Sequence, residues 1–303
     1  MINLSTEQTA LVEPKQAYAL LTFTTFLWAV GVVIARGVHE EIPLIGLSFW
    51  RWSAAAVMIL PFVWKELGVK LDLVRAHLGI LVIQGMLIVG SGSLLFYSLN
   101  YTTAINATLV NAAQPVFTVL LAWIILNDRL NGYQITGILS AFTGVGIMVS
   151  RADWNVISDL AFNTGDFLVI LAICGYALYA INIRSLPREL GTFPALFVIL
   201  VSGSIFLLPF YLAETVYLKP VTVSLKLIGI VMVLALLVSI LSISMWNKAN
   251  SIVGPGRAAI FVNLMPVYGS ILAILFLGEA LHLYHVTGAL LVCAGIFLVV
   301  KKQ

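Results

Sequence analysis

The sequence has very little charge. Asp, Glu, Lys and Arg make up 10% of its 303 residues, whereas soluble domains carry about 25%. With 61% hydrophobic residues and a mean hydropathy of +1.06, the chain has too few polar side chains to cover a surface in water. We therefore expect an integral membrane protein. The net charge of +3 comes without a basic patch interleaved with aromatic residues, so nucleic acid is not an expected partner.

Cysteine and catalytic motifs are also scarce. Cys174 and Cys293 lie inside apolar runs without a CxxC motif or a neighbouring histidine, so neither a disulfide framework nor a metal site is predicted. The glycine motifs at 90–92 and 144–146 lack the strand that a nucleotide-binding loop needs. No Asp or Glu falls deep inside an apolar run, which argues against proton coupling. We expect no enzyme activity, no cofactor and no metal.

Long apolar runs dominate what is present. A membrane helix needs about 20 mainly apolar residues, and runs of this kind lack the two-residue alternation of barrel strands. The first 16 residues lack the features of a cleaved signal, so the first apolar helix is expected to direct insertion. Ten spans are predicted, near residues 17–36, 43–64, 77–99, 104–126, 132–150, 164–184, 194–213, 223–246, 257–277 and 282–300.

Lysine and arginine set the expected orientation. Most of them fall in the loops on the same side as the N-terminus, and cytoplasmic loops carry this excess. Both termini are therefore predicted to be cytoplasmic.

The two halves of the chain repeat each other. Pro115 and Pro266 lie 151 positions apart, and the same spacing aligns the residues around them. A similar spacing aligns Trp28-Ala29 with Tyr176-Ala177. The predicted organisation is a cytoplasmic tail, a five-helix repeat, an extracytoplasmic linker and a second repeat, at residues 1–16, 17–150, 151–163 and 164–303. Because five is odd, the second repeat must be inverted, which is a recurring transporter architecture.

Polar stripes predict which helices surround a central cavity. The first, third, fourth, sixth, eighth and ninth helices carry such stripes at helical spacing. The other four helices are expected to be supports, with Gly137, Ala141 and Gly144 as close-packing positions in the fifth. The predicted substrate-binding residues are Trp28, Tyr97, Tyr101, Asn111, Gln114, Tyr179, Trp246 and Asn263. The alternative is that these side chains only join helices or mark the membrane interface.

Prolines and a few charges stand out within or beside the spans. Pro115 and Pro266 are expected to bend the fourth and ninth helices, as hinges or as static kinks. Asp128 and Glu279 are interpreted as caps of the helix that follows each of them. An alternative for Asp128 is a gate ion pair with a cytoplasmic arginine such as Arg257.

Arg51 is the one charge placed within a span. Trp50 and Trp52 flank it, and we interpret it as an anchor that reaches toward the membrane interface.

Two segments carry a family resemblance. Residues 106–150, NATLVNAAQPVFTVLLAWIILNDRLNGYQITGILSAFTGVGIMVS, resemble the signature of EamA-type members of the drug/metabolite transporter superfamily. GRAAIFVNLMPVYGSILAILFLGEALHLYHVTGALLVCAGIFLV is its second copy, and Arg51 matches the family's arginine in the second helix. The resemblance implies ten helices in two inverted repeats and export of small metabolites from the bacterial cytoplasm. The aromatic content is most similar to that of the aromatic amino acid exporters.

The expected function is therefore export across the bacterial inner membrane. The best candidate substrates are amino acids, including aromatic ones, moved by alternating access without obligatory proton coupling. The first helix lacks the carboxylate of the related four-helix drug exporters. Partners are expected to be a small-molecule substrate and membrane lipid, with the chain a monomer. The alternatives are a lipid translocase, a membrane scaffold that transports nothing, or an exporter of a drug, a nucleotide-like solute or a sugar phosphate, the last favoured only by Lys248 and Arg257.

Overall fold

The computed structural model describes residues 14–126, 131–153, 163–182, 185–253, 258 and 261–300. Within these residues every regular element is a helix, which confirms the expected all-α class. Seven helical segments of this part are long and apolar enough to cross a membrane, and three more are shorter apolar helices. Together they account for the ten apolar runs of the sequence.

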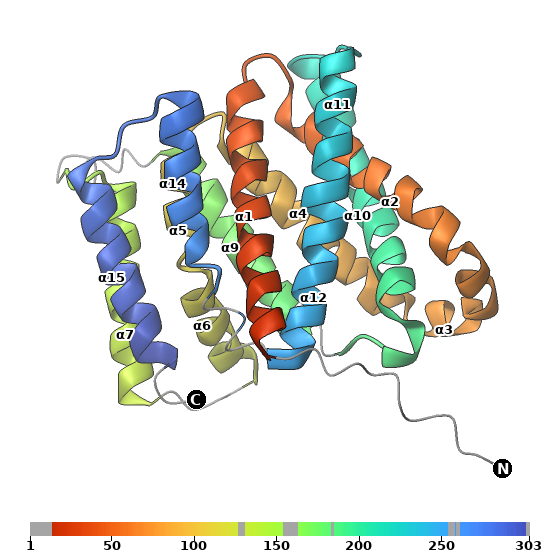
Figure 1. The fold of residues 1–303 in the computed structure, drawn as a ribbon, viewed down its shortest axis with the longest axis horizontal. Helices are drawn as coiled ribbons and strands as arrows, with labels where there is room; N and C mark the ends of the chain where they lie inside the picture. The colour runs from red at the N-terminus through yellow and green to blue at the C-terminus, as the bar shows by residue number, and fades with distance from the viewer. Residues whose placement is uncertain are drawn as a thin grey trace.

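The elements of each half follow the order of the runs (Figure 1). The first half contains α1 (Pro14–Val38), α2 (Leu44–Val69), the short α3 (Leu71–Ala76), α4 (Leu78–Ser98), α5 (Ala104–Asn111), α6 (Gln114–Leu126) and α7 (Gly132–Val149). The second half contains α9 (Thr164–Asn182), η2 (Arg188–Leu190), α10 (Thr192–Tyr217), α11 (Leu225–Val233), the π-helix η3 (Leu234–Leu241), α12 (Ser242–Val253), α14 (Leu264–Leu277) and α15 (Leu283–Val300).

The first helices of the two halves run in opposite directions. The end of α1, the start of α5 and the end of α14 meet, because Arg36 and the amide of Ala104 both approach Glu279. The start of α9 lies at this same end, where the side-chain amide of Asn163 donates to the backbone carbonyl of Tyr101. We call this the Glu279 end of the molecule. The opposite end, where Lys70 donates to the carbonyl of Leu190, we call the Lys70 end.

Two of the spans are interrupted beside a proline. Ala112 and Ala113 form a turn between α5 and α6, just before Pro115. In the second half, Val262 and Asn263 form a turn before α14, whose third residue is Pro266. A proline has no amide hydrogen and clashes with the preceding turn, so a break at each site is expected. Whether these points move as hinges stays a prediction.

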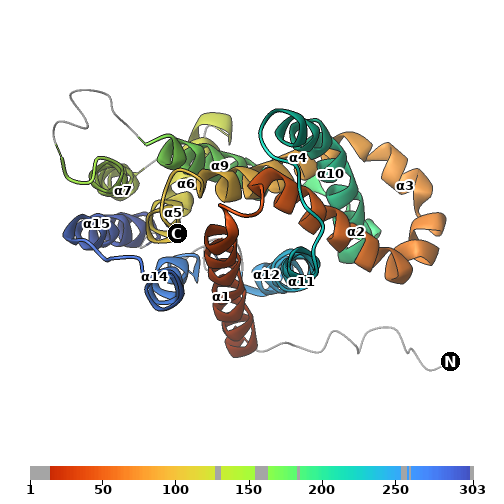
Figure 2. The same cartoon turned by 90° about the horizontal axis from the view of Figure 1, so that it is seen from above.

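Glycines allow α7 and α15 to touch along their length. A Cβ atom on Gly144 would lie 2.6 Å from the carbonyl oxygen of Gly288, and one on Gly295 would lie 2.4 Å from that of Gly137. These approaches are too close for any side chain, so the predicted close-packing positions of the fifth helix do pack against a partner helix. The two helices lie side by side at one edge of the molecule in both ribbon views (Figures 1 and 2).

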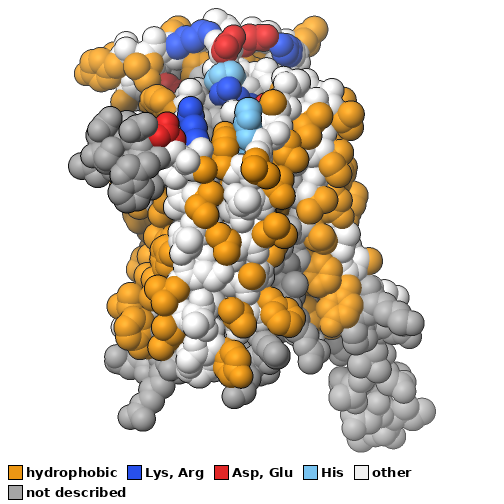
Figure 3. Space-filling model, turned by 90° about the vertical axis from the view of Figure 1, so that its left-hand side faces the viewer, with side chains coloured by type: hydrophobic (Ala, Val, Ile, Leu, Met, Phe, Trp, Pro, Cys, Tyr) orange, Lys and Arg blue, Asp and Glu red, His pale blue; other side chains and the backbone are white. Residues whose placement is uncertain are grey.

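The outer surface is apolar over most of its height. Large side chains such as Phe62, Trp64 and Leu225 are exposed to more than two thirds of their area. In the face drawn in Figure 3, hydrophobic side chains cover the body, and the charged side chains that can be seen gather at the Glu279 end. Such a band would be unstable in water but is the surface that lipid requires.

Candidate functional site

A cavity of about 160 Å³ lies between the two halves. Helices of both halves supply its walls: α1, α2, α4, α5 and α6 from the first, and α9, η3, α12 and the start of α14 from the second. Val262, in the turn before α14, also lines it. This largely matches the set of helices expected from the polar stripes. The exception is the second helix, α2, which was expected to be a support but contributes Arg51 and Trp52 to the wall.

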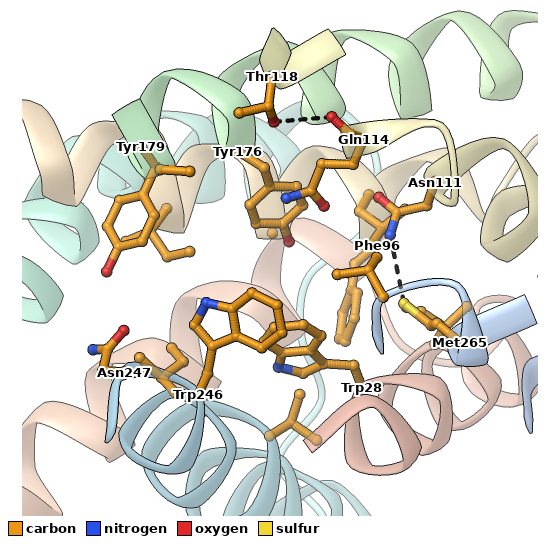
Figure 4. A pocket seen from close by; sticks show the side chains of 18 of the residues that line it. Trp28, Phe96, Asn111, Gln114, Thr118, Tyr176, Tyr179, Trp246, Asn247 and Met265 are labelled. Atoms are coloured by element: carbon orange, nitrogen blue, oxygen red, sulfur yellow. Dashed lines mark hydrogen bonds between the residues drawn. The ribbon is translucent and has the colours of Figure 1, made fainter. Parts of the chain in front are cut away.

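Six aromatic residues line the cavity, and four of them lie on two opposite sides of it. The rings of Trp28 and Trp246 are 5.0 Å apart between centroids and tilted by 45°. The indole nitrogen of Trp28 donates a 2.9 Å hydrogen bond to the hydroxyl of Ser242, which fixes this ring in place. Tyr176 and Tyr179 project from α9 on the opposite side of the cavity (Figure 4). The arrangement offers ring faces on two sides to an apolar or aromatic guest.

Amide side chains supply the polar part of the lining. Asn111 donates from its amide nitrogen to the sulfur of Met265 at 3.4 Å, which ties α5 to the start of α14. Gln114 lies at the first turn of α6, with its side chain toward Tyr176 (Figure 4). The side-chain oxygens of Asn111, Asn247 and Asn250 have no hydrogen-bond partner among the described residues. An amide can both donate and accept, so these groups are available to a polar ligand.

Arg51 does not reach the membrane interface, and the anchoring interpretation was wrong. Its residue is only 2% exposed, and its side chain lies in the cavity wall. The central carbon of the guanidinium lies 4.1 Å from the ring centre of Trp52 and 4.2 Å from that of Phe96. The two rings hold the cation between them, which turns the side chain inward instead of along the helix toward water.

The repeat explains part of this arrangement. Trp28 aligns with Tyr176 in the second half, and both line the cavity. The 151-residue spacing aligns Asn111 with Val262 and Gln114 with Met265, and these four also line it. Tyr176 was missed as a site residue, although its alignment with Trp28 was visible in the sequence. Asn247 and Asn250 were missed because only the three-dimensional position separates them from other polar residues on helices. Thr118 belongs to the predicted polar stripe of the fourth helix and lines the cavity, although it was not named among the substrate-binding residues.

Some predicted site residues lie away from the cavity lining. The hydroxyls of Tyr97 and Tyr101 contact each other at 3.1 Å near the Glu279 end of α4, and Tyr101 is 46% exposed. Asn263 occupies the turn before α14, where its side-chain oxygen is buried without a partner among the described residues. Pro115 lines the cavity, whereas Pro266 is buried and does not. Trp28, Asn111, Gln114, Tyr179 and Trp246 do line it.

Glu279 caps a different helix from the one predicted. Its two carboxylate oxygens accept 2.9 Å hydrogen bonds from the amides of Ala104 and Ile105, at the start of α5 in the other half, rather than from α15. Arg36 lies 3.8 Å from the same carboxylate. Gly278, at φ +65°, ends α14 in the left-handed conformation and directs the chain toward α5. Asp128, the matching acid of the first half, lies outside the described residues.

Further carboxylates close the Glu279 end. Glu214 accepts hydrogen bonds from the amides of Ile45 at 3.1 Å and Gly46 at 2.6 Å, at the start of α2. Asp166 is 1% exposed and accepts from the hydroxyl of Thr102 at 2.8 Å. Glu214 and Asp166 lie near helix ends, in agreement with the expectation that no Asp or Glu falls deep inside an apolar run. The sequence alone did not show that both are buried.

One ion pair at the Glu279 end lies outside the cavity lining. Lys226, at the start of α11, pairs with the exposed Glu41 before α2 and lowers the pKa of its carboxyl. In the part of the chain that the structure describes, no group of three or more His, Cys, Asp or Glu side chains could hold a metal ion.

A multi-pass membrane protein with a cavity between two similar halves has the architecture of a membrane transporter. Residues 15–150 and 163–301 each match the EamA-like transporter family, one match for each half. The chain therefore belongs to the EamA-like transporter family, which confirms the resemblance at that level.

Known proteins similar to this chain include other transporters. An uncharacterized transporter, YyaM, of Bacillus subtilis (strain 168) is 29% identical over 252 residues, covering 82% of this chain and 81% of the relative. A probable amino-acid metabolite efflux pump of Escherichia coli (strain K12) is 26% identical over 291 residues, covering 92% and 93%. One solved crystal structure of a protein matches with a TM-score of 0.58 at 15% identity, over 95% of this chain and 98% of that one. That likeness concerns the fold alone.

Proposed function

We propose that this transporter exports amino acids with large apolar or aromatic side chains, and similar small metabolites, across the bacterial inner membrane. The observation that carries the proposal is the lining of the cavity, which combines the rings of Trp28, Trp246 and Tyr176 with asparagine side chains whose oxygens have no partner among the described residues. Aromatic contacts contribute about 0.5–1.5 kcal/mol beyond area burial. The relatives named as probable amino-acid metabolite efflux pumps favour the same substrate class.

The proposed mechanism is alternating access between the two halves. The lining extends toward the Lys70 end, through Thr118 of α6 and Asn250 of α12. It includes none of the residues that join the halves at the Glu279 end, such as Glu279 and Ala104. With both termini in the cytoplasm, the Glu279 end is extracytoplasmic, and the cavity is placed to load substrate from inside the cell. Export then requires the contacts at the Glu279 end to separate.

Flux into proteoliposomes tests the proposal. Wild-type protein should carry labelled phenylalanine or tryptophan and leave a labelled lipid in its original leaflet. Trp28→Ala and Asn111→Ala should each lower the rate at least several-fold while the protein remains in the membrane. Trp64→Ala is the matched control, because Trp64 is 69% exposed on the lipid-facing surface. Wild-type rates in both cavity variants would place the site elsewhere, and movement of lipid alone would support a translocase instead.

A further inference from the structure

Arg51 is a buried cation without a counter-charge among the described residues. Its Nε and Nη2 atoms have no hydrogen-bond partner there, and none of the ion pairs of that part of the chain involves it. Its guanidinium carbon lies over the rings of Trp52 and Phe96. Ring faces orient a guanidinium, but they leave its in-plane N–H donors free. A charge buried in this way is costly unless an anion pairs with it.

Other unused donors lie beside Arg51. A Cβ atom on Gly92 would lie 3.3 Å from Nη2 of Arg51 and 3.3 Å from the hydroxyl of Tyr176, so the two groups approach the same glycine. The indole nitrogen of Trp52 is buried and has no partner in the described structure. The same Cβ atom would lie 2.9 Å from Cζ2 of Trp52, so the absence of a side chain at residue 92 is what lets these three groups come together. All four residues line the cavity.

The cavity also contains acceptors. Among the described lining residues, the side-chain oxygens of Asn247 and Asn250 on α12 and of Asn111 on α5 have no partner, and all three are acceptors as assigned. The 148-residue spacing that aligns Trp28 with Tyr176 also aligns Arg51 with Ile199 in α10, so the second half supplies no matching cation. The lining therefore combines the cation of α2 and its neighbouring donors with unpartnered acceptors on α5 and α12.

We propose that Arg51 binds the carboxylate of the transported molecule. A guanidinium pairs with a carboxylate through two parallel hydrogen bonds, and a single buried cation matches a single negative charge better than a doubly charged phosphate. The amide oxygens of α12 then face an amino group, and the aromatic rings face the apolar side chain. The inference rests on the proposed function in one respect, that this cavity is the transport site. It narrows the substrate class to molecules in which the carboxylate is essential and the amino group is not.

The test compares three ligands that differ only in their charged groups. Phenylalanine carries both groups, 3-phenylpropionate lacks the amine, and phenylalaninamide lacks the carboxylate. Binding to the purified full-length protein is followed by the fluorescence of the cavity tryptophans. The wild type should bind the two carboxylates at least about tenfold more tightly than the amide, since a charge-assisted pair is lost with the carboxylate.

Variants of Arg51 assign this preference to one residue. Arg51→Gln should weaken binding of both carboxylates at least about tenfold and leave phenylalaninamide unchanged, which removes the preference. Arg51→Lys should keep part of the preference for carboxylates, because lysine carries the positive charge but lacks the planar guanidinium that binds a carboxylate through two hydrogen bonds. Arg75→Gln is the control, because Arg75 is 69% exposed and pairs only with Asp72 in the described structure. Gly92→Ala keeps the charge, but its methyl group would crowd Trp52 and Nη2 of Arg51 and shift the guanidinium, so it should also reduce the preference.

The outcomes separate this inference from the proposed function. If the Arg51→Gln protein folds and still prefers carboxylates as the wild type does, Arg51 is structural and the inference is overturned, while phenylalanine flux by the wild type still supports the function. If Arg51→Gln does not fold, an unchanged preference in Gly92→Ala overturns the inference and a reduced one supports it. If the wild type carries none of phenylalanine, tryptophan and leucine, the proposed function fails. Leucine and leucinamide then repeat the comparison, and equal binding of that pair overturns the inference as well.

Discussion

Glu279 accepts a hydrogen bond of 2.9 Å from the backbone amide of Ala104, so the end of α14 in the second half caps the start of α5 in the first. Negative charge at a helix N-terminus is favourable, and here the second carboxylate oxygen satisfies the next amide, that of Ile105. The contact joins the two halves at the end away from the cavity. In an alternating-access cycle it would have to break when that end opens.

Replacement of the Glu279 side chain, which caps α5, should destabilise the protein. We expect Glu279→Ala to lower the free energy of unfolding by about 2 kcal/mol, since two buried amides lose their charged acceptor. Thermal unfolding in detergent measures the change. Asp72→Ala is the control, because the Asp72 side chain is 99% exposed. Equal unfolding temperatures for the two variants would contradict the structural role of Glu279.

Two glycines of α7 provide a matched test of helix packing. Gly144→Ala should destabilise the protein, because the new methyl group would lie 2.6 Å from the backbone of α15. Gly146→Ala, two residues further along the same helix, meets nothing within 4 Å and should be neutral or slightly stabilising. Thermal unfolding of the two variants side by side gives the comparison. If the two substitutions have the same effect, α7 and α15 do not pack as described.

The orientation of the chain can be tested with engineered thiols. Single cysteines at Glu40 and Lys70 lie at opposite ends of the molecule, in a protein whose Cys174 and Cys293 have been replaced by alanine. An impermeant maleimide added to intact cells should label the cysteine at residue 40, and the one at residue 70 only after lysis. Labelling of residue 70 in intact cells would reverse the assignment of both ends and of the transport direction.

Transport is predicted not to require protons. One carboxyl is buried in the described structure outside the cavity lining, that of Asp166 beside Thr102 and Asn106. A pH gradient imposed on proteoliposomes should leave net flux of a neutral amino acid nearly unchanged, in the wild type and in Asp166→Asn. Accumulation that follows the gradient in the wild type and disappears in Asp166→Asn would show that coupling exists and runs through this carboxyl.

The sequence predicted the helices well because each apolar run is long enough to be recognised alone. The repeat was also predictable, because the 151-residue spacing between Pro115 and Pro266 can be read from the sequence alone. The position of Arg51 could not be predicted in this way. Its inward direction depends on Phe96 of α4, which lies in another span and stacks on the guanidinium. Asn263 was predicted to bind substrate because its amide resembles that of Asn111, but it does not line the cavity. The 151-residue spacing aligns Asn111 with Val262 instead, and Val262 does line it.

The hydrogen bond between Glu214 and the amide of Gly46 joins residues 168 positions apart in the chain. During synthesis, the first turn of α2 enters the membrane long before the carboxylate that caps it exists. Until α10 has been inserted, those amides must remain near water or bind lipid headgroups, because the hydrocarbon core offers them no acceptor. The first five helices are therefore not a finished unit when they leave the ribosome. They become one only as part of the whole chain, so a protein cut between the halves should need both pieces present in the same membrane to mature.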